Sequence, residues 1–322
     1  MPESSTRSKS ASRRKNGRRG ATRRPATGKT ETTSGDGARA VILKTYKLYI
    51  GGKFPRTESG RYDILKTSRG AAVANICRGS RKDFREAVVS ARSAAQKWGA
   101  ASAFLRGQIL YRVAEMLQGR ASQFVQELEL QGFTLREASR NAEASIDRLV
   151  YYAGWADKFQ QMFSSVNPVS SSHFNFSMCE PTGVVSVLAP GEGGLLGLVS
   201  CLAPVIVGGN TCTLLASQST PLTAITFAEV LHGADLPAGV VNILTGRRGE
   251  LLEPFSTHMD VNAIVCCGSD SKERQEMEFN AAGNVKRTVC RDLPDWYSPD
   301  AQSPYMIADT QEIKTTWHPI GT

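Results

Sequence analysis

Residues 183–246 carry the most regular hydrophobic pattern in the chain. Val, Leu and Ile concentrate in three short runs, 183–189, 211–216 and 240–244, which is typical of strands buried on both faces. Between the runs lie Leu195–Val207, long and apolar enough for a packed helix, and an amphipathic segment that Pro221 opens with Thr220 as its N-cap. The pattern predicts strand, helix, strand, helix, strand, and therefore an α/β fold with a parallel sheet.

Several short motifs follow one another along this frame and on either side of it. They are Glu180-Pro181-x-Gly183-Val184-Val185, Gly209-Asn210, Thr220-Pro221-Leu222-Thr223-Ala224, Leu236-Pro237-x-Gly239-Val240-Val241-Asn242-Ile243-x-x-Gly246, Asp260-Val261-x-x-Ile264, Gly268-Ser269 and Ala281-Ala282-Gly283-x-x-Lys286-Arg287. In their order and spacing these motifs resemble the coenzyme-binding domain of the aldehyde dehydrogenase superfamily. Upstream, Lys47–Phe54 resembles the family's opening hairpin and Asp83–Trp98 its first long helix. The resemblance covers residues 44–294 and implies a Rossmann-like fold.

The resemblance places NAD or NADP at the carboxyl ends of the strands, with Gly246, Gly268 and Ser269 as vestigial coenzyme-binding residues. Two partners of the adenosine ribose are replaced. Leu215 stands where the family has a lysine, and Gln218 stands where it has an acidic residue. Two charge-assisted hydrogen bonds are lost. We therefore expect weak coenzyme binding or none.

Residues that the family uses for chemistry are also replaced. Glu192 stands at the position of an asparagine that holds the oxyanion, and a carboxylate repels negative charge there. Arg291 stands at the position of the general base, and a permanently protonated arginine abstracts no proton. Glu273 replaces a glycine of the phosphate-side loop. Cys266 and Cys267 invite interpretation as a nucleophile pair, but their place after the run 263–265 favours a coenzyme-side loop. We expect no catalytic residue.

The family's catalytic domain has no counterpart in the sequence, since 28 residues follow Pro294. Residues 308–322 resemble instead the family's C-terminal oligomerisation strand, and residues 168–181 resemble the other strand of that hairpin. The resemblance thus divides the chain into a basic tail (1–43), a coenzyme-binding domain (44–294), a linker (295–307) and an oligomerisation strand (308–322). A similar arrangement is the incomplete trailing domain of the two-domain family 16 aldehyde dehydrogenases.

Charge is concentrated at the start of the chain. The net charge is +9, and residues 1–40 contain eleven Lys or Arg against three acidic residues, which leaves +1 for the remainder. A segment so poor in large apolar residues is expected to be disordered. It has no apolar core for a secretory signal and no hydrophobic face for a mitochondrial presequence. Two interpretations of this segment remain. It binds a polyanion weakly, or it has no partner and is a solubilising tail or an unselected extension.

The seven cysteines are odd in number and lack CxxC spacing, which argues against a disulfide framework and for a reducing, cytoplasmic compartment. The four histidines are scattered singly, so no metal site is expected. The longest apolar run is too short to span a membrane.

These observations predict a non-catalytic aldehyde dehydrogenase-like subunit that acts in assembly or regulation of a complete aldehyde dehydrogenase. It would dock on itself or on such an enzyme through Ser170–Glu180 and Gln311–Trp317. Two alternatives remain. One is a residual NAD(P)-dependent aldehyde oxidoreductase that works with a partner's catalytic domain, and the other is a nucleic-acid-associated protein that uses the basic tail.

Overall fold

A five-stranded parallel sheet forms the centre of the fold. The computed structural model describes residues 42–67 and 69–321; the basic tail predicted for residues 1–43 lies almost entirely outside them. The strand order is β10-β9-β6-β7-β8. The strands are β6 (Val184–Leu188), β7 (Thr211–Leu215), β8 (Val241–Leu244), β9 (Ala263–Cys267) and β10 (Arg287–Arg291). Every residue of β6 to β9 is buried, as the unbroken apolar runs predict.

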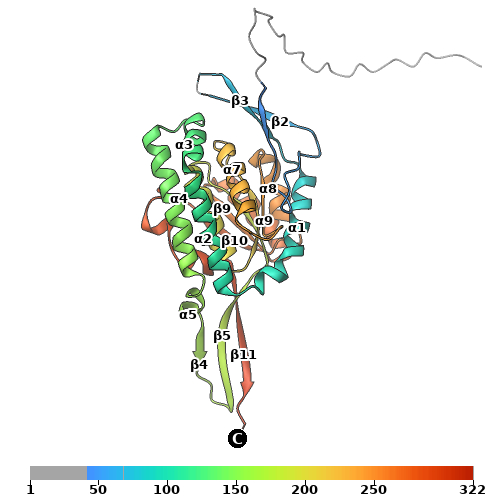
Figure 1. The fold of residues 1–322 in the computed structure, drawn as a ribbon. Helices are drawn as coiled ribbons and strands as arrows, with labels where there is room; N and C mark the ends of the chain where they lie inside the picture. The colour runs from blue at the N-terminus through green and yellow to red at the C-terminus, as the bar shows by residue number, and fades with distance from the viewer. Residues whose placement is uncertain (1–41, 68, 322) are drawn as a thin grey trace, which may run out of the picture. The chain divides into compact units, whose positions relative to one another are not determined.

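Two layers of helices cover one face of this sheet. The inner layer is α6 (Gly194–Val207) and α7 (Pro221–Gly233), and both pack against helices of an outer layer. The outer layer is α2 (Ala103–Gly119), α3 (Ala121–Leu130) and α4 (Leu135–Trp155), seen in green in Figure 1. Every residue of α6 is buried between the sheet and the outer helices, so this helix is apolar on all sides. In contrast, α7 exposes His232 and part of Glu229.

The opposite face of the sheet is covered by α1 (Arg81–Gly99), α8 (Arg248–Thr257) and α9 (Ser271–Ala281). Alternate residues of each strand point to the two faces, so the sheet divides the buried side chains into two clusters. Leu215 and Cys266 belong to the cluster beneath α1 and α8, whereas Cys267 belongs to the cluster beneath α6. The short 3-10 helix Ala282–Asn284 follows α9.

Local capping residues explain the starts of several helices. Ser80 and Thr134 form capping boxes with Asp83 and Glu137 at the starts of α1 and α4. Thr220 is the N-cap residue of α7, as predicted. Its side chain makes no capping hydrogen bond, and Oε1 of Gln131 accepts from the backbone N of Leu222 at 2.9 Å instead.

A small sheet lies at the start of the described chain, with the order β1-β3-β2. It consists of β1 (Lys44–Tyr46), β2 (Tyr62–Lys66) and β3 (Ala72–Cys77). The predicted opening hairpin, Lys47–Phe54, is a tight turn between β1 and β2. Its bridge pairs Ile50 with Lys53, and its neighbouring residue Tyr49 pairs with Ile243 of β8. These pairings attach the turn to the edge of the central sheet.

The third sheet is an antiparallel arm that extends away from the helices (Figure 1). Its strands are β4 (Ser165–Asn167), β5 (His173–Pro181) and β11 (Gln311–Pro319), in the order β11-β5-β4, and the short helix α5 (Phe159–Phe163) leads into it. The register of β5 and β11 runs without interruption from Gln311↔Pro181 to Pro319↔His173. The two segments that resemble the family's oligomerisation strands therefore pair with each other over residues 173–181 and 311–319.

Residues 292–310 connect β10 to β11 and pack on the side of the sheet that α6 covers. They contain a 3-10 turn (Pro299–Ala301) and the short helix α10 (Tyr305–Ala308). Trp296, Ala301 and Ile307 are buried within this connection. We call residues 292–310 the closing segment, because it covers α4 and α6.

Among the described residues, no helix has the length and apolar character needed to cross a membrane.

Candidate functional site at the carboxyl edge of the sheet

The central sheet has a switch point between β6 and β9. From β6 the chain passes through α6 to β7 on one side, and from β9 it passes through α9 to β10 on the other. In open α/β sheets, ligands bind in the crevice that such a reversal leaves beyond the carboxyl ends of the strands. Ala189 and Gly268 directly follow the two strands and mark this crevice.

A single side chain, Arg248, spans the crevice. It projects from the first residue of α8, and its Nη1 donates to the carbonyl oxygen of Ala189 at 3.3 Å. Its Nη2 lies 3.0 Å from Sγ of Cys266, and its Nε donates to Oε2 of Glu273 at 3.0 Å. The guanidinium group therefore contacts the ends of both strands and the first turn of α9 at once.

The side chains of Leu215 and Gln218 both make contacts within the fold. Leu215 is 2% exposed and packs in the cluster beneath α1 and α8. Oε1 of Gln218 accepts from the backbone N of Arg248 at 3.0 Å and so caps α8. A pocket of about 220 Å³ remains beside them, lined by Leu188, Leu215, Ser217, Ser219 and Arg248 among others. Pockets that hold drug-sized ligands measure roughly 300–1,000 Å³.

The structure separates the three predicted coenzyme-binding residues. Gly246 follows β8, where a side chain would meet Leu251 at 3.1 Å and the backbone of Gly79 at 3.3 Å. Gly268 has φ +60° with open space around it, so a turn alone explains the glycine there. The hydroxyl of Ser269 is buried without a hydrogen-bond partner among the described residues. Gly268 and Ser269 adjoin the crevice, whereas Gly246 lines a neighbouring pocket of about 550 Å³.

The start of α6 is closed by two residues from other parts of the chain. Oδ1 of Asn141 accepts from the backbone N of Leu196 at 3.1 Å, and its Nδ2 donates to the carbonyl oxygen of Gly193 at 3.0 Å. The Trp296 ring lies so close to Gly193 that a Cβ there would be 2.7 Å from it. Helix N-termini bind anions through free N–H groups. Here the polar end is already capped, while the Glu192 carboxylate is exposed to solvent.

Arg291, at the position of the family's base, is 6% exposed and holds the closing segment. Its Nη2 donates to Oδ2 of Asp309 at 2.9 Å and to the carbonyl oxygen of Met306 at 3.1 Å. Burial lowers its pKa, but the nearby Cys201, Cys267 and Asp309 more than offset this, so the pKa lies above its ordinary value. A group held in its charged form accepts no proton.

Cys266 and Cys267 lie within β9, so the prediction that they belong to a loop after the strand is wrong. The strand continues because their side chains alternate into the two buried clusters. Burial raises the pKa of Cys266 to about 11, although Arg248 opposes the effect. A hydrogen bond with Cys201, 3.2 Å away between Sγ atoms, and burial raise that of Cys267. All seven cysteines are free thiols, and these two are far from activated.

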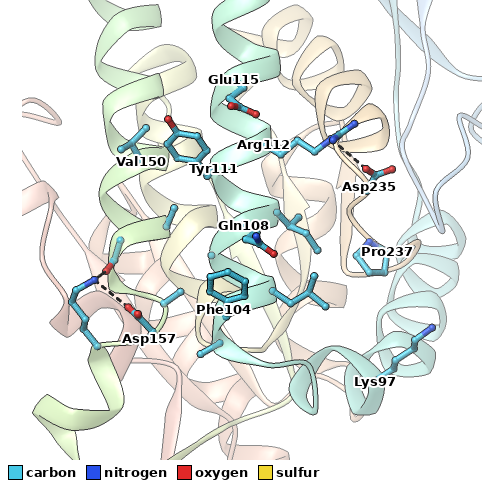
Figure 2. Close-up of a pocket in the computed structure, with 18 residues that line it drawn as sticks. Lys97, Phe104, Gln108, Tyr111, Arg112, Glu115, Val150, Asp157, Asp235 and Pro237 are labelled. Carbon is cyan, nitrogen blue, oxygen red and sulfur yellow. Dashed lines mark hydrogen bonds and ion pairs between the residues drawn. The ribbon is translucent and has the colours of Figure 1, made fainter.

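A larger concavity of about 1030 Å³ lies between α2 and α4 (Figure 2). Its exposed apolar side chains include Phe104 and Tyr111. Two ion pairs lie on its rim, Arg112 with Asp235 at 3.2 Å and Lys158 with Asp157 at 3.1 Å, and the lining also includes Lys97, Gln108 and Glu115.

Sequence reasoning missed Arg248 as the residue that occupies the crevice. The available signal was the pair Arg247-Arg248, which directly follows the third strand and Gly246, where a helix begins. The position of Asn141 as the cap of α6 was also missed, since 55 residues separate it from Leu196.

Known proteins resemble this chain over the same region. A model of the aldehyde dehydrogenase family matches residues 54–291. Mitochondrial 10-formyltetrahydrofolate dehydrogenase of Homo sapiens is 29% identical over 253 residues, covering 77% of this chain and 27% of the relative. Its cytosolic counterpart in Xenopus tropicalis is 31% identical over 248 residues, and omega-crystallin of Enteroctopus dofleini is 29% identical over 251. The chain spans 28% and 50% of these two.

Solved structures share the fold. The NAD+ complex of an aldehyde dehydrogenase from Bacillus cereus aligns with a TM-score of 0.73 at 24% identity, covering 77% of this chain and 50% of the other. Betaine aldehyde dehydrogenase from Staphylococcus aureus, also with NAD+, aligns with a TM-score of 0.72 at 23% identity, covering 76% and 49%. The family match extends over more than half of the sequence and across the whole central sheet, and the chain therefore belongs to the aldehyde dehydrogenase family.

Proposed function

We propose that this protein is a non-catalytic aldehyde dehydrogenase-like subunit that acts in assembly or regulation of a complete aldehyde dehydrogenase. The observation that carries the proposal is the arm formed by β4, β5 and β11. It has exposed apolar side chains on both faces and, among the described residues, β11 pairs on one side only. A sheet of this size is marginal in water unless something covers it.

The register assigns the apolar residues of the arm to its two faces. Ile313 and Trp317 stand opposite Cys179 and Asn175, and they are 58% and 57% exposed. Phe174 and Met178 lie on the other face and are 43% and 37% exposed. Exposed apolar surface of this extent is typical of sites that another protein covers.

The outer edge of β11 offers a second means of association. Nine residues of extended backbone, Gln311–Pro319, present alternate N–H and C=O groups on the side away from β5. Such an edge is a template for strand addition from another chain. At the start of β11, Arg287 of β10 forms an ion pair with Glu312 at 3.1 Å.

The family's coenzyme does not fit the crevice. Arg248 fills the space between the ends of β6 and β9, and the ribose partners are replaced by a core leucine and a helix cap. The proposal that it is a residual oxidoreductase finds no support in Arg291, which holds the closing segment.

The test is the oligomeric state of the full chain, measured by size-exclusion chromatography with light scattering. We expect a dimer or larger assembly, and we expect Trp317→Glu to weaken it. A buried tryptophan at an interface commonly contributes 2 kcal/mol or more, so the dissociation constant should rise by roughly 30-fold. Circular dichroism should remain unchanged, because Trp317 is exposed within one chain.

The matched control is Phe279→Glu, which adds the same charge at an apolar residue of α9 that is 83% exposed. It should assemble as the wild type does. If the chain does not self-associate, a tagged full-length chain is recovered from the cells in which it naturally occurs. It should then retain a complete aldehyde dehydrogenase, which mass spectrometry identifies. A monodisperse monomer that retains no such enzyme would refute the assembly role.

A further inference from the structure

We infer that Arg248 and Glu273 form a built-in latch that closes the coenzyme crevice and keeps dinucleotides out. Two of the solved structures that share this fold are NAD+ complexes, so the obstacle we infer comes from residues particular to this chain. The inference concerns the crevice alone and does not depend on the assembly role.

Three contacts fix the latch across three elements. Arg248 begins α8, Ala189 follows β6, and Glu273 lies in the first turn of α9. Nε, Nη1 and Nη2 of the guanidinium group are each assigned to a different partner, at 3.0, 3.3 and 3.0 Å. The pair is shielded, with side-chain exposures of 19% for Arg248 and 27% for Glu273. Such a fork of donors holds one orientation better than a single contact does.

The first backbone N–H groups of α9 are already capped by a side chain close to the latch. Oδ1 of Asp270 accepts from the backbone N of Lys272 at 2.9 Å and of Glu273 at 2.8 Å. A helix of eleven residues would otherwise favour a phosphate at this end. Here two carboxylates stand there instead, and the nearby guanidinium charge is already paired.

A diphosphate entering the crevice would meet the latch in two ways. It would have to displace Arg248 from the carbonyl of Ala189 and from Cys266, and its charge would then face Glu273 and Asp270. The pocket directly beside the closed latch measures about 220 Å³, and a neighbouring pocket of about 550 Å³ shares Ser217 and Gln218 with it, so the inference rests on the displacement and the repulsion and not on volume. The latch and the two replaced residues act in different ways. The latch obstructs the crevice, whereas Leu215 and Gln218 remove favourable contacts with the ribose without filling the crevice.

The experiment opens the latch with the charge-conserving double variant R248A/E273A in the full chain. Calorimetry with NAD and with ADP should show an affinity at least about tenfold stronger than that of the wild type. Cys266 reports on closure independently, because it is buried beneath Arg248. Removing Arg248 also changes the pKa of this thiol, so the quantity compared is the pH-independent rate constant of its alkylation by a maleimide, obtained from the pH dependence, with the modified thiol located by peptide mass spectrometry. This rate constant should become at least about tenfold larger in the double variant.

The control is R112A/D235A, which removes an exposed Arg–Asp pair on the rim of the groove between α2 and α4. It should match the wild type in both measurements. The milder, nearly isosteric E273Q breaks one contact and serves if the double variant is unstable; it too should speed Cys266 alkylation. Light scattering on the double variant separates this inference from the proposed function, because assembly should be unchanged.

Two results would overturn the latch. One is wild-type protein that binds NAD as tightly as the double variant does. The other is alkylation of Cys266 at the wild-type rate in both E273Q and R248A/E273A.

Discussion

Arginine side chains in this protein hold main-chain segments in place, and one of them, Arg291, does so at the position where the family resemblance implies a general base. Arg148 donates to the carbonyl oxygen of Trp296, Arg248 to that of Ala189 and Arg291 to that of Met306. Arginine suits this role because its charge is permanent and its donors form a rigid fork. Arg291, for example, cannot act as a base, and it also binds the closing segment.

Lys286 provides a pH-dependent prediction at the residue scale. It is 7% exposed, and its Nζ donates to the carbonyl oxygen of His258 at 2.9 Å. Burial lowers its pKa from 10.5 to about 8. Between these pH values the unfolded chain holds a proton that the folded chain has released. The free energy of unfolding of the wild type, relative to Lys286→Met, should therefore rise with pH from 8 to 10.5, by up to about 3 kcal/mol.

Denaturant unfolding of both proteins at several pH values measures this difference. The exposed Lys53, changed to methionine, corrects for the loss of one positive charge. A difference between wild type and Lys286→Met that falls as the pH rises would contradict the prediction, because it would mean that the fold stabilises the charged amine.

At the scale of elements, the closing segment depends on α4. Arg148 is 3% exposed and donates from Nε to Oε1 of Gln302 and from Nη2 to the carbonyl oxygen of Trp296, both at 3.0 Å. Its Nη1 contacts Ser200 and the carbonyl oxygen of Ala301. Arg148 therefore connects α4 and α6 to the segment that leads into β11 of the arm.

Arg148→Ala should therefore destabilise the protein strongly. It leaves several buried acceptors without donors, each worth about 1–3 kcal/mol, so we expect a loss of at least about 3 kcal/mol in the free energy of unfolding. Arg136→Ala, an exposed change on the same helix, should alter it by less than about 0.5 kcal/mol. Urea unfolding of both variants decides the matter, and equal losses would show that the buried contacts contribute nothing specific.

The elements of the central sheet were predictable because their signals are local. Unbroken apolar runs identify β6, β7 and β8, and Pro221 marks the first residue of α7. The contacts that set the site are not local. Gln131 caps α7 from a distant loop, and Arg248 reaches Ala189, 59 residues earlier in the chain. Periodicity reports which residues are buried, but it does not report which distant partner a polar side chain meets.

At the scale of the whole molecule, charge and folded structure are separated along the sequence. Residues 1–40 contain no Leu, Ile, Val or aromatic residue and carry +8 of the net +9. They lie outside the described residues, and the remaining 282 residues carry a net charge of +1. We propose that any contact of this protein with a polyanion is weak and depends on this segment, since clustered arginines bind phosphate through counterion release.

Deleting residues 1–40 tests this proposal. The salt concentration that elutes the protein from heparin should fall sharply, because most of the positive charge is gone, while the melting temperature should change little, because the segment offers almost no apolar surface to a core. A full-length variant with the eleven Lys and Arg residues of this segment changed to Gln is the matched control, and it should elute with the deletion. If the two variants elute as the wild type does, the polyanion site lies in residues 41–322. If only the deletion elutes early, the segment binds through something other than its charge.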